Sequence, residues 1–166
     1  RGSPPPEGNF DIVGAAGCDV APVDLTDEAQ ALRLKAYIWP EFTARFARMD
    51  AAIEAAKTFP PEIVRMRAAD FLAERLERPQ EEGTTRVLTH SVVWQYIPQP
   101  ERDRIVELME AAGDRACEDT PLAWVSLEAN RDTHRHELTV SYWPDGDMRR
   151  RLATAHPHGK WVEWRG

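Results

Sequence analysis

Hydrophobic residues recur along this chain with two different spacings, and segments with one spacing alternate with segments that have the other. Short apolar runs rich in β-branched residues predict strands, and apolar residues three or four positions apart predict helices. Strands that alternate with helices are typical of a mostly parallel sheet. The predicted strands span residues 10–16, 62–69, 86–93, 121–128, 136–143 and 160–164, and the predicted helices span 28–37, 42–59, 71–77 and 101–117.

The order of these elements predicts an open α/β sheet that is mostly parallel, with an antiparallel C-terminal edge. The last two predicted strands have no long helix between them, so a hairpin suits them better than another parallel unit. Residues 1–9 are rich in Pro and Gly and are predicted to be a linker. Residues 10–166 then belong to one α/β domain, a length that permits a sizeable core.

Two local patterns predict where helices begin. Asp27 followed by Gln30 fits a capping box, in which an acid accepts a backbone hydrogen bond three residues on. Asp70 precedes the apolar residues of the third helix and is also of the type preferred at a helix N-cap. The capping interpretation of Asp70 therefore stands beside any functional one.

Charge and composition exclude several classes of protein. The formal net charge of −7, with acids and bases interspersed, argues against a nucleic-acid surface. The chain has no run of about 20 apolar residues, so no membrane span is expected, and it shows no signal segment. Two distant cysteines, Cys18 and Cys117, fit a reducing, cytoplasmic setting.

Polar side chains follow the predicted strands where ligands of open parallel sheets bind. Asp19 follows the first strand, Asp70 the second, and Glu128 ends the fourth. Carboxylates at these places could accept hydrogen bonds from ribose hydroxyls or an adenine amino group. Asp19 is the acid that we favour for such a role. The sequence therefore predicts a small-molecule pocket at this end of the sheet.

The third strand ends in an unusual group of side chains. His90 could act as a general base, because imidazole exchanges a proton near neutral pH. The alternative is a core histidine that is hydrogen-bonded to its surroundings. Ser91, Trp94 and Tyr96 follow within six residues. The two aromatic rings could form a stacking wall for a flat ligand or simply cover the edge of the sheet.

Two histidine pairs raise the question of a metal. His134 and His136 form one pair with a single residue between them, and His156 and His158 form the other. Zinc binds imidazole readily, but no Cys or carboxylate at matching spacing accompanies either pair. No metal ligands are assigned, and a metal-dependent hydrolase is the third-ranked hypothesis.

Several segments together resemble the bacterial uncharacterised family called domain of unknown function 2332. The segments that carry the resemblance are 17–24, 37–40, 89–96, 121–128, 143–146 and 156–161. Members of that family are longer and carry an upstream glycine-rich segment that looks like the S-adenosylmethionine loop of class I methyltransferases. The resemblance implies a Rossmann-like, methyltransferase-like fold of which this chain is the C-terminal half, without the N-terminal strand and its glycine loop.

The lead hypothesis, which combines this resemblance with the residue patterns above, assigns roles to particular residues. Asp19 would hold the ribose of S-adenosylmethionine and Asp70 would meet its adenine. His90 would be the catalytic residue, while Ser91, Trp94, Tyr96 and Glu128 would line the side of the methyl acceptor. A missing N-terminal segment or a partner chain would complete the sheet. The alternative function is a methyltransferase-like module kept for interaction or regulation, without catalysis.

Overall fold

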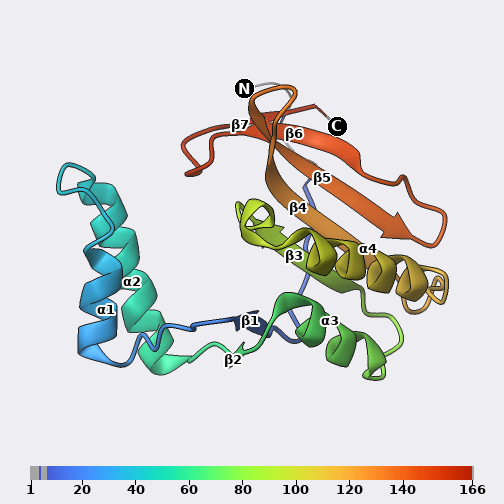
Figure 1. Cartoon of the computed structure of the whole chain (residues 1–166), viewed down its shortest axis with the longest axis horizontal. Coiled ribbons are helices and arrows are strands. Elements are labelled where there is room, and N and C mark those ends of the chain that lie inside the picture. Colours follow the sequence, from blue (N-terminus) through green and yellow to red (C-terminus); the bar gives the residue numbers. More distant parts are fainter. Residues whose placement is uncertain (1–3, 5–6, 166) are drawn as a thin grey trace. The chain divides into compact units, whose positions relative to one another are not determined.

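The computed structural model describes residue 4 and residues 7–165, and these fall into two compact units (Figure 1). Phe10–Ala68 forms one unit, and the chain from Ala69 onward forms the other with the N-terminal residues. Of the predicted linker 1–9, residues 1–3 and 5–6 lie outside the described residues, and the others have no regular secondary structure.

The Phe10–Ala68 unit consists of a two-stranded parallel sheet and a helical hairpin. Strand β1 (Gly17–Asp19) pairs with strand β2 (Ile63–Arg65) over three residues. Helices α1 (Glu28–Lys35) and α2 (Thr43–Thr58) lie between them in sequence. The buried apolar residues of the hairpin are Ala31, Ile53 and Ala56.

The predicted cap of the first helix is confirmed. The Asp27 carboxylate accepts a hydrogen bond from the Gln30 backbone N–H at 2.9 Å. The reciprocal half of a capping box is not made, because the Gln30 side chain accepts from the Asp24 backbone N–H instead. The helix ends at Lys35, two residues earlier than predicted.

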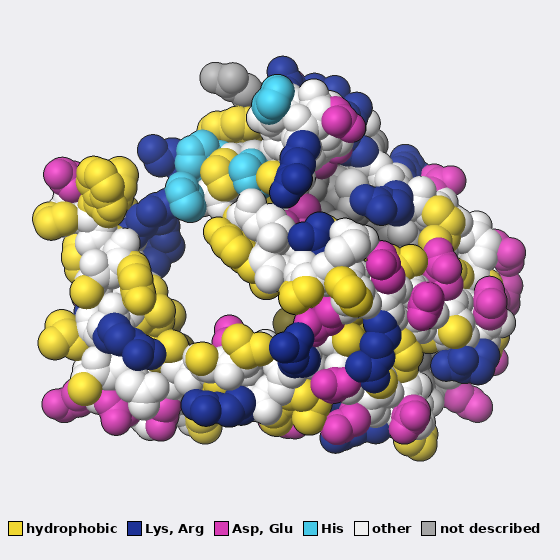
Figure 2. All heavy atoms as spheres, in the orientation of Figure 1, with side chains coloured by type: hydrophobic (Ala, Val, Ile, Leu, Met, Phe, Trp, Pro, Cys, Tyr) yellow, Lys and Arg dark blue, Asp and Glu magenta, His cyan; other side chains and the backbone are white. Residues whose placement is uncertain are grey.

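The strand predicted at 10–16 is wrong, since β1 begins only at Gly17. Phe10, Ile12 and Val13 are 83%, 76% and 77% exposed, and no strand of the described residues runs beside them. Apolar content alone predicted a strand there, but a strand also needs a neighbour for its backbone groups. Figure 2 likewise shows hydrophobic side chains on the surface of the α1–α2 hairpin.

The second unit is a five-stranded sheet with helices. Its strand order is β3-β4-β5-β6-β7, and its helices are α3, the single-turn η1 and α4. The elements are α3 (Ala68–Glu77), β3 (Arg86–Ser91), η1 (Trp94–Tyr96), α4 (Gln99–Gly113), β4 (Leu122–Asn130), β5 (Arg135–Trp143), β6 (Arg150–Ala155) and β7 (Val162–Trp164).

The prediction of a mostly parallel sheet needs correction. Only β3 and β4 are parallel in the five-stranded sheet, and β4 to β7 are joined by antiparallel pairings. The antiparallel C-terminal part was expected, but β6 was not. Its first residues are Arg150 and Arg151, and its buried part contains alanines, which have a low strand propensity. The fold is therefore mixed α/β.

Helices α3 and α4 both contribute buried apolar residues beside the sheet. Ile105 and Met109 are 3% and 0% exposed, and Leu122 of β4 is 3% exposed. Near the end of α4, a Cβ atom on Gly113 would overlap the indole ring of Trp143. A glycine at this position thus allows the helix to approach β5 closely.

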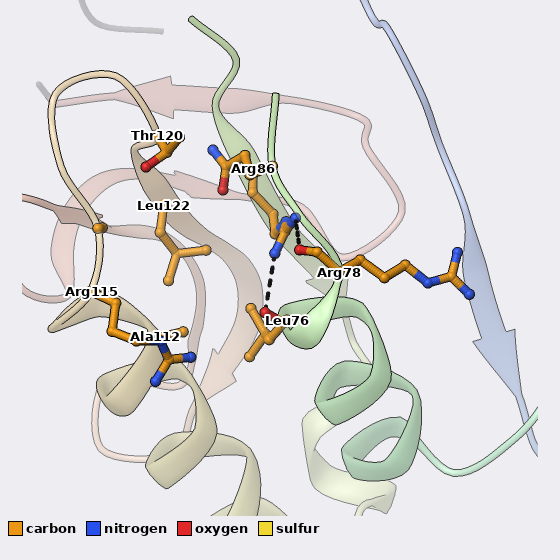
Figure 3. Close-up of a pocket in the computed structure, with 9 residues that line it drawn as sticks. Leu76, Arg78, Arg86, Ala112, Arg115, Thr120 and Leu122 are labelled. Carbon is orange, nitrogen blue, oxygen red and sulfur yellow. Dashed lines mark hydrogen bonds between the residues drawn. The ribbon is translucent and has the colours of Figure 1, made fainter. Parts of the chain in front are cut away.

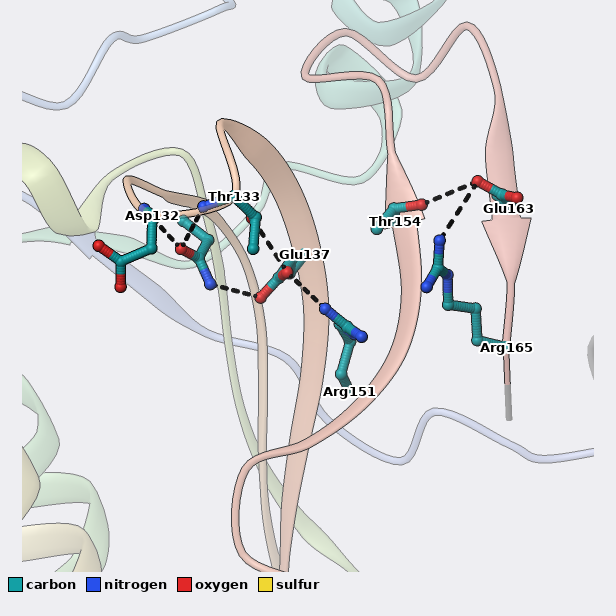
Figure 4. Close-up of polar contacts among 8 residues, drawn as sticks. Asp132, Thr133, Glu137, Arg151, Thr154, Glu163 and Arg165 are labelled. Atoms are coloured by element: carbon teal, nitrogen blue, oxygen red, sulfur yellow. Dashed lines mark hydrogen bonds and ion pairs between the residues drawn. The ribbon is translucent and has the colours of Figure 1, made fainter.

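A polar network fixes the hairpin between β4 and β5 (Figure 4). Glu137 accepts hydrogen bonds from Asn130, Thr133 and Arg151 at 2.9, 3.2 and 2.8 Å. Burial raises the pKa of Glu137, but the hydrogen bonds outweigh it and hold the pKa below the ordinary value. The ionised carboxylate is therefore part of the hairpin.

Candidate functional site

The candidate site begins at the last residues of β3, which pairs in parallel with β4. Arg86, Leu88 and His90 lie on the more covered face of β3, whereas Val87, Thr89 and Ser91 are exposed. This alternation is that of a strand with one covered face. The site thus includes the His90 side chain on one face and Ser91 on the other.

The chain leaves β3 through a strained residue. Val92 has a φ of 52°, which is uncommon for a β-branched side chain. Its backbone N–H still bonds to the Leu127 carbonyl at 2.9 Å, and the next N–H, of Val93, donates to Glu128 Oε1 at 3.1 Å. The turn therefore directs the chain into η1, which carries Trp94 and Tyr96.

Both ring nitrogens of His90 are hydrogen-bonded. Nδ1 lies 2.8 Å from Glu128 Oε1, and the Trp124 indole N–H donates to Nε2 at 3.0 Å. An indole nitrogen can only donate, so Nε2 must be the acceptor. Nδ1 then carries the proton and donates a hydrogen bond to Glu128. The geometry thus assigns a neutral imidazole with its hydrogen on Nδ1.

Two indole rings pack against this histidine. Trp94 stacks on His90 with ring centroids 5.3 Å apart and an angle of 18° between planes. Trp124 is tilted against both, at 6.1 Å from His90 and 5.7 Å from Trp94. We call His90, Trp94, Trp124 and Glu128 the His90 cluster. The His90 and Glu128 side chains are only 14% and 16% exposed.

The hydrogen bonds of the His90 cluster determine which of its atoms a ligand can reach. The basic atom of the imidazole, Nε2, is already an acceptor for Trp124, so a ligand can reach it only if the indole moves. Glu128 Oε1 accepts two hydrogen bonds, which compensate for its partial removal from water. Glu128 thus holds the imidazole proton on Nδ1. The basic Nε2 would become available to a ligand if the Trp124 indole moved away.

The structure brings together part of the predicted site. His90 contacts both Trp94 and Glu128. Ser91 lies on the opposite face of β3, and Tyr96 is 76% exposed. Trp124, which donates to His90 Nε2, was not among the predicted site residues. The register between β3 and β4 could have identified it, because Trp124 pairs with Leu88, which lies two residues before His90 on the same face of β3.

The two predicted cofactor acids lie in different units. Asp19 is the last residue of β1, and its Oδ1 accepts the Ala21 backbone N–H at 2.7 Å. Asp70 lies in the first turn of α3 and is not its N-cap, because the helix begins at Ala68. Its Oδ1 bonds to Nη1 of Arg104 at 2.6 Å, which links α3 to α4.

A cleft of about 200 Å³ lies at the other end of β3 and β4 (Figure 3). Arg86 donates to the carbonyls of Leu76, Arg78 and Pro79 at 3.4, 2.9 and 3.2 Å. These are the last carbonyls of α3 and the residues after it, which lack helical partners. Burial lowers the pKa of Arg86. We therefore interpret Arg86 as a cap of α3.

The histidine pairs do not form a metal site in the described part of the chain. No group of three His, Cys, Asp or Glu side chains suited to a metal ion occurs there. His156 Nδ1 accepts the backbone N–H of His158 at 3.0 Å, and their rings lie 5.6 Å apart. His134, with a φ of 53°, lies in the turn between β4 and β5.

Comparison with known proteins identifies a protein family. The family model described as "Uncharacterized protein conserved in bacteria (DUF2332)" matches residues 1–164. No curated protein and no solved structure matches the chain. Among the described helices, none has the combined length and apolar character that crossing a membrane requires.

Proposed function

The chain belongs to DUF2332, a family of uncharacterised proteins conserved in bacteria, and we propose that it is a methyltransferase-like α/β domain that binds S-adenosylmethionine and acts on a small molecule. The observation that carries this proposal is the His90 cluster at the carboxyl ends of two adjacent parallel strands. Ligands of open α/β sheets bind beyond such ends. In this proposal the chain is the C-terminal part of a Rossmann-like domain.

Asp19 fits the role of a ribose-binding acid. It is exposed and ends a parallel strand, and both features support this role. Oδ1 is used by the Ala21 N–H, while Oδ2 has no partner among the described residues. A free carboxylate oxygen is a good acceptor for a hydroxyl group. This chemistry supports the cofactor assignment.

Asp70 fits its proposed role less directly. Its ion pair with Arg104 joins two side chains that are each about half exposed, 48% and 51%. Such surface pairs contribute little to stability, typically about 0–1 kcal/mol. An adenine amino group could therefore compete for the carboxylate at small cost. The alternative role of Asp70 is to hold α3 against α4.

The remaining residues would serve the methyl acceptor. S-adenosylmethionine, when bound, supplies an already reactive methyl group, so the protein has to orient the acceptor and remove at most one proton. His90 would be the catalytic base, with Glu128 fixing the proton on Nδ1. Trp94 would line the acceptor side beside His90. Ser91 and Tyr96 stay predictions for that side, because Ser91 lies on the opposite face of β3 and Tyr96 is exposed. Displacement of the Trp124 indole would expose Nε2 to the acceptor.

The proposal includes a setting and partners. Neither Cys18 nor Cys117 forms a disulfide bond, which supports a cytoplasmic location. The expected ligand is a small molecule and not a nucleic acid. A further segment or a partner chain would complete the sheet, because the parallel part of the five-stranded sheet stops after two strands.

A second candidate is a non-catalytic interaction or regulatory module with the same fold. The observation that favours it is the occupation of His90, since Trp124 caps Nε2 and Trp94 covers one face of the ring. In this case the His90 cluster stabilises the end of β3 and has no ligand.

Calorimetric titration of S-adenosylmethionine and S-adenosylhomocysteine into the natural protein separates the two candidates. We expect micromolar binding to the unsubstituted protein and loss of binding in Asp19→Ala with an unchanged melting curve. Asp132→Ala is the matched control, because it removes an exposed carboxylate from the turn after β4. Absence of binding by the natural protein would favour the non-catalytic candidate.

A further inference from the structure

The cleft at the start of β3 and β4 shares no lining residue with the His90 cluster (Figure 3). Arg86 and Leu122 are the first residues of these two strands, are partners in the register and both line the cleft. His90 is four residues further along β3, about 13 Å away at about 3.3 Å per residue. We call this cleft the Arg86 cleft. It is a separate site within the same unit.

Arg86 brings a positive charge into the cleft that no acid of the described residues matches. Its three hydrogen bonds all go to neutral backbone carbonyls, which leaves two of the five N–H groups of the guanidinium without a partner among the described residues. Burial lowers the pKa of Arg86, and no carboxylate of the described residues opposes this effect. Charged groups that leave water are normally paired. Arg86 therefore favours an anion in the cleft.

Arg115 adds a second positive charge to the lining. Its Nη1 donates to the Ala111 carbonyl at 2.7 Å, so the side chain runs back along the end of α4. The described lining residues include no Asp or Glu, although the chain has a net charge of −7. The side chain of Arg78 points away from Arg86 and does not contribute its charge (Figure 3). The two cations of the cleft are thus Arg86 and Arg115.

The walls of the Arg86 cleft are largely apolar. They include Leu76 of α3, Ala112 of α4 and Leu122 of β4, which is 3% exposed. A strongly hydrated anion such as phosphate would lose water against these side chains without compensation. A carboxylate on a short aliphatic chain suits both parts, because a guanidinium binds the carboxylate and apolar walls bind the chain. The volume of about 200 Å³ is below that of pockets for drug-sized ligands, so the chain must be short.

We propose that the Arg86 cleft binds a small aliphatic monocarboxylate. Its carboxylate would face Arg86 and Arg115, and its chain would lie against Leu76 and Leu122. The ligand would join the end of α3, the start of β3 and the end of α4, all of which contribute lining residues. This inference does not rest on the proposed function, because the cleft contains neither the cofactor acids nor a member of the His90 cluster.

Titration of 3-methylbutyrate into the natural protein tests the site. The readouts in ¹H–¹⁵N spectra are the Nε–H resonance of Arg86 and the backbone resonance of Leu122. Ionic strength is held constant, because salt screens the attraction between charges. We expect saturable shifts of both resonances that are half complete at about 1 mM, as is usual for a ligand of so few atoms. The neutral isostere 3-methylbutanamide should bind at least about tenfold more weakly, since it lacks the charge.

A pair of arginine variants tests the role of charge. Arg115→Gln removes an exposed cation of the cleft and should weaken 3-methylbutyrate binding by about threefold. Arg131→Gln is the matched control, because it removes an exposed arginine from the turn between β4 and β5, outside the cleft. It should leave the affinity unchanged. Both variants should keep the melting curve of the natural protein.

A pair of alanine variants tests the shape of the cleft. Ala112→Leu places a larger side chain on a lining position of α4 without a change of charge, and should abolish the shifts. Ala111→Leu is the matched control, because Ala111 is exposed on the same helix and is not among the lining residues. It should bind 3-methylbutyrate as the natural protein does. Leucine is a good helix former, so α4 should tolerate both changes.

Four results would overturn the inference. Absence of saturable shifts up to about 20 mM, far above the affinity expected for such a ligand, would show that Arg86 serves only as a cap of α3. Equal binding of 3-methylbutanamide would show that the cleft does not recognise charge. Equal binding of inorganic phosphate would show a site for anions in general. Equal weakening by Arg115→Gln and Arg131→Gln would show that only the total charge of the protein matters.

Discussion

The indole nitrogen of Trp124 lies 3.0 Å from Nε2 of His90 and donates a hydrogen bond to it, across two parallel strands. This bond determines where the histidine carries its proton, because the indole cannot accept. It also closes the basic atom of the imidazole to solvent. The relationship between these two residues therefore controls what the His90 cluster can do.

Trp124→Phe should expose the basic nitrogen of His90. The phenyl ring retains aromatic packing but lacks the N–H, so the variant should lose about 1 kcal/mol of stability, the usual net contribution of one hydrogen bond. Acylation of His90 by diethyl pyrocarbonate, followed by peptide mass spectrometry, should be faster than in the natural protein. His134, in the exposed β4–β5 turn, is the internal reference. An unchanged ratio of the two rates would contradict the capping role of Trp124.

Glu128→Gln should destabilise the turn after β3. The amide oxygen can still accept from His90 Nδ1 and the Val93 N–H, but the hydrogen bonds lose the assistance of the carboxylate charge. We expect a loss of about 1–2 kcal/mol in urea unfolding. Glu118→Gln, at an exposed position whose side chain forms no hydrogen bond or ion pair with the described residues, should change stability by less than about 0.5 kcal/mol. Similar values for both variants would show that Glu128 does not anchor the turn.

Glu137 should make the folded state sensitive to acid. Its pKa is lower in the folded protein than the ordinary value of 4.5, so the carboxylate binds protons more readily when the chain is unfolded. The stabilisation is fully present above that ordinary value and is lost as the pH falls through the lower, folded value. In Glu137→Gln this part of the pH dependence should disappear. Urea unfolding of both proteins between about pH 7 and 3 measures it, and parallel curves would contradict the role of the carboxylate.

Gly113→Ala should destabilise the protein, although alanine is the better helix former. In an open helix the exchange would contribute about 1 kcal/mol of stability. Here the added methyl group overlaps the Trp143 ring, and overpacking of this kind typically costs about 1–3 kcal/mol. Thermal unfolding of Gly113→Ala and of the double variant Gly113→Ala/Trp143→Leu measures the effect. Failure of the smaller leucine to recover stability would contradict the steric explanation.

The sequence predicted those elements whose local pattern agrees with their surroundings. The Asp27 cap and the long amphipathic helix, here α4, were both found from spacing alone. The strand at 10–16 was wrong because apolar residues do not by themselves provide a neighbouring strand. β6 was missed because its two arginines and its alanines are not typical of a strand. Its alanines are nevertheless buried, and it pairs with β5.

The candidate site followed the same rule. His90, Trp94 and Glu128 were proposed from their place at or near the ends of predicted strands, which depends only on the order of elements. Trp124 required the register between β3 and β4, which is fixed by tertiary pairing and is not visible in one strand. The roles of Asp19 and Asp70 toward a cofactor stay predictions.

The most direct test of the ligand site is the Trp124 indole N–H resonance in ¹H–¹⁵N spectra, assigned with Trp124→Phe. It is followed while S-adenosylhomocysteine and then candidate small-molecule acceptors are added to the natural protein. The account predicts that this resonance moves on ligand binding and that His90→Gln abolishes the shift. A ligand that binds tightly and leaves the Trp124 resonance unchanged would contradict the account and place its site elsewhere.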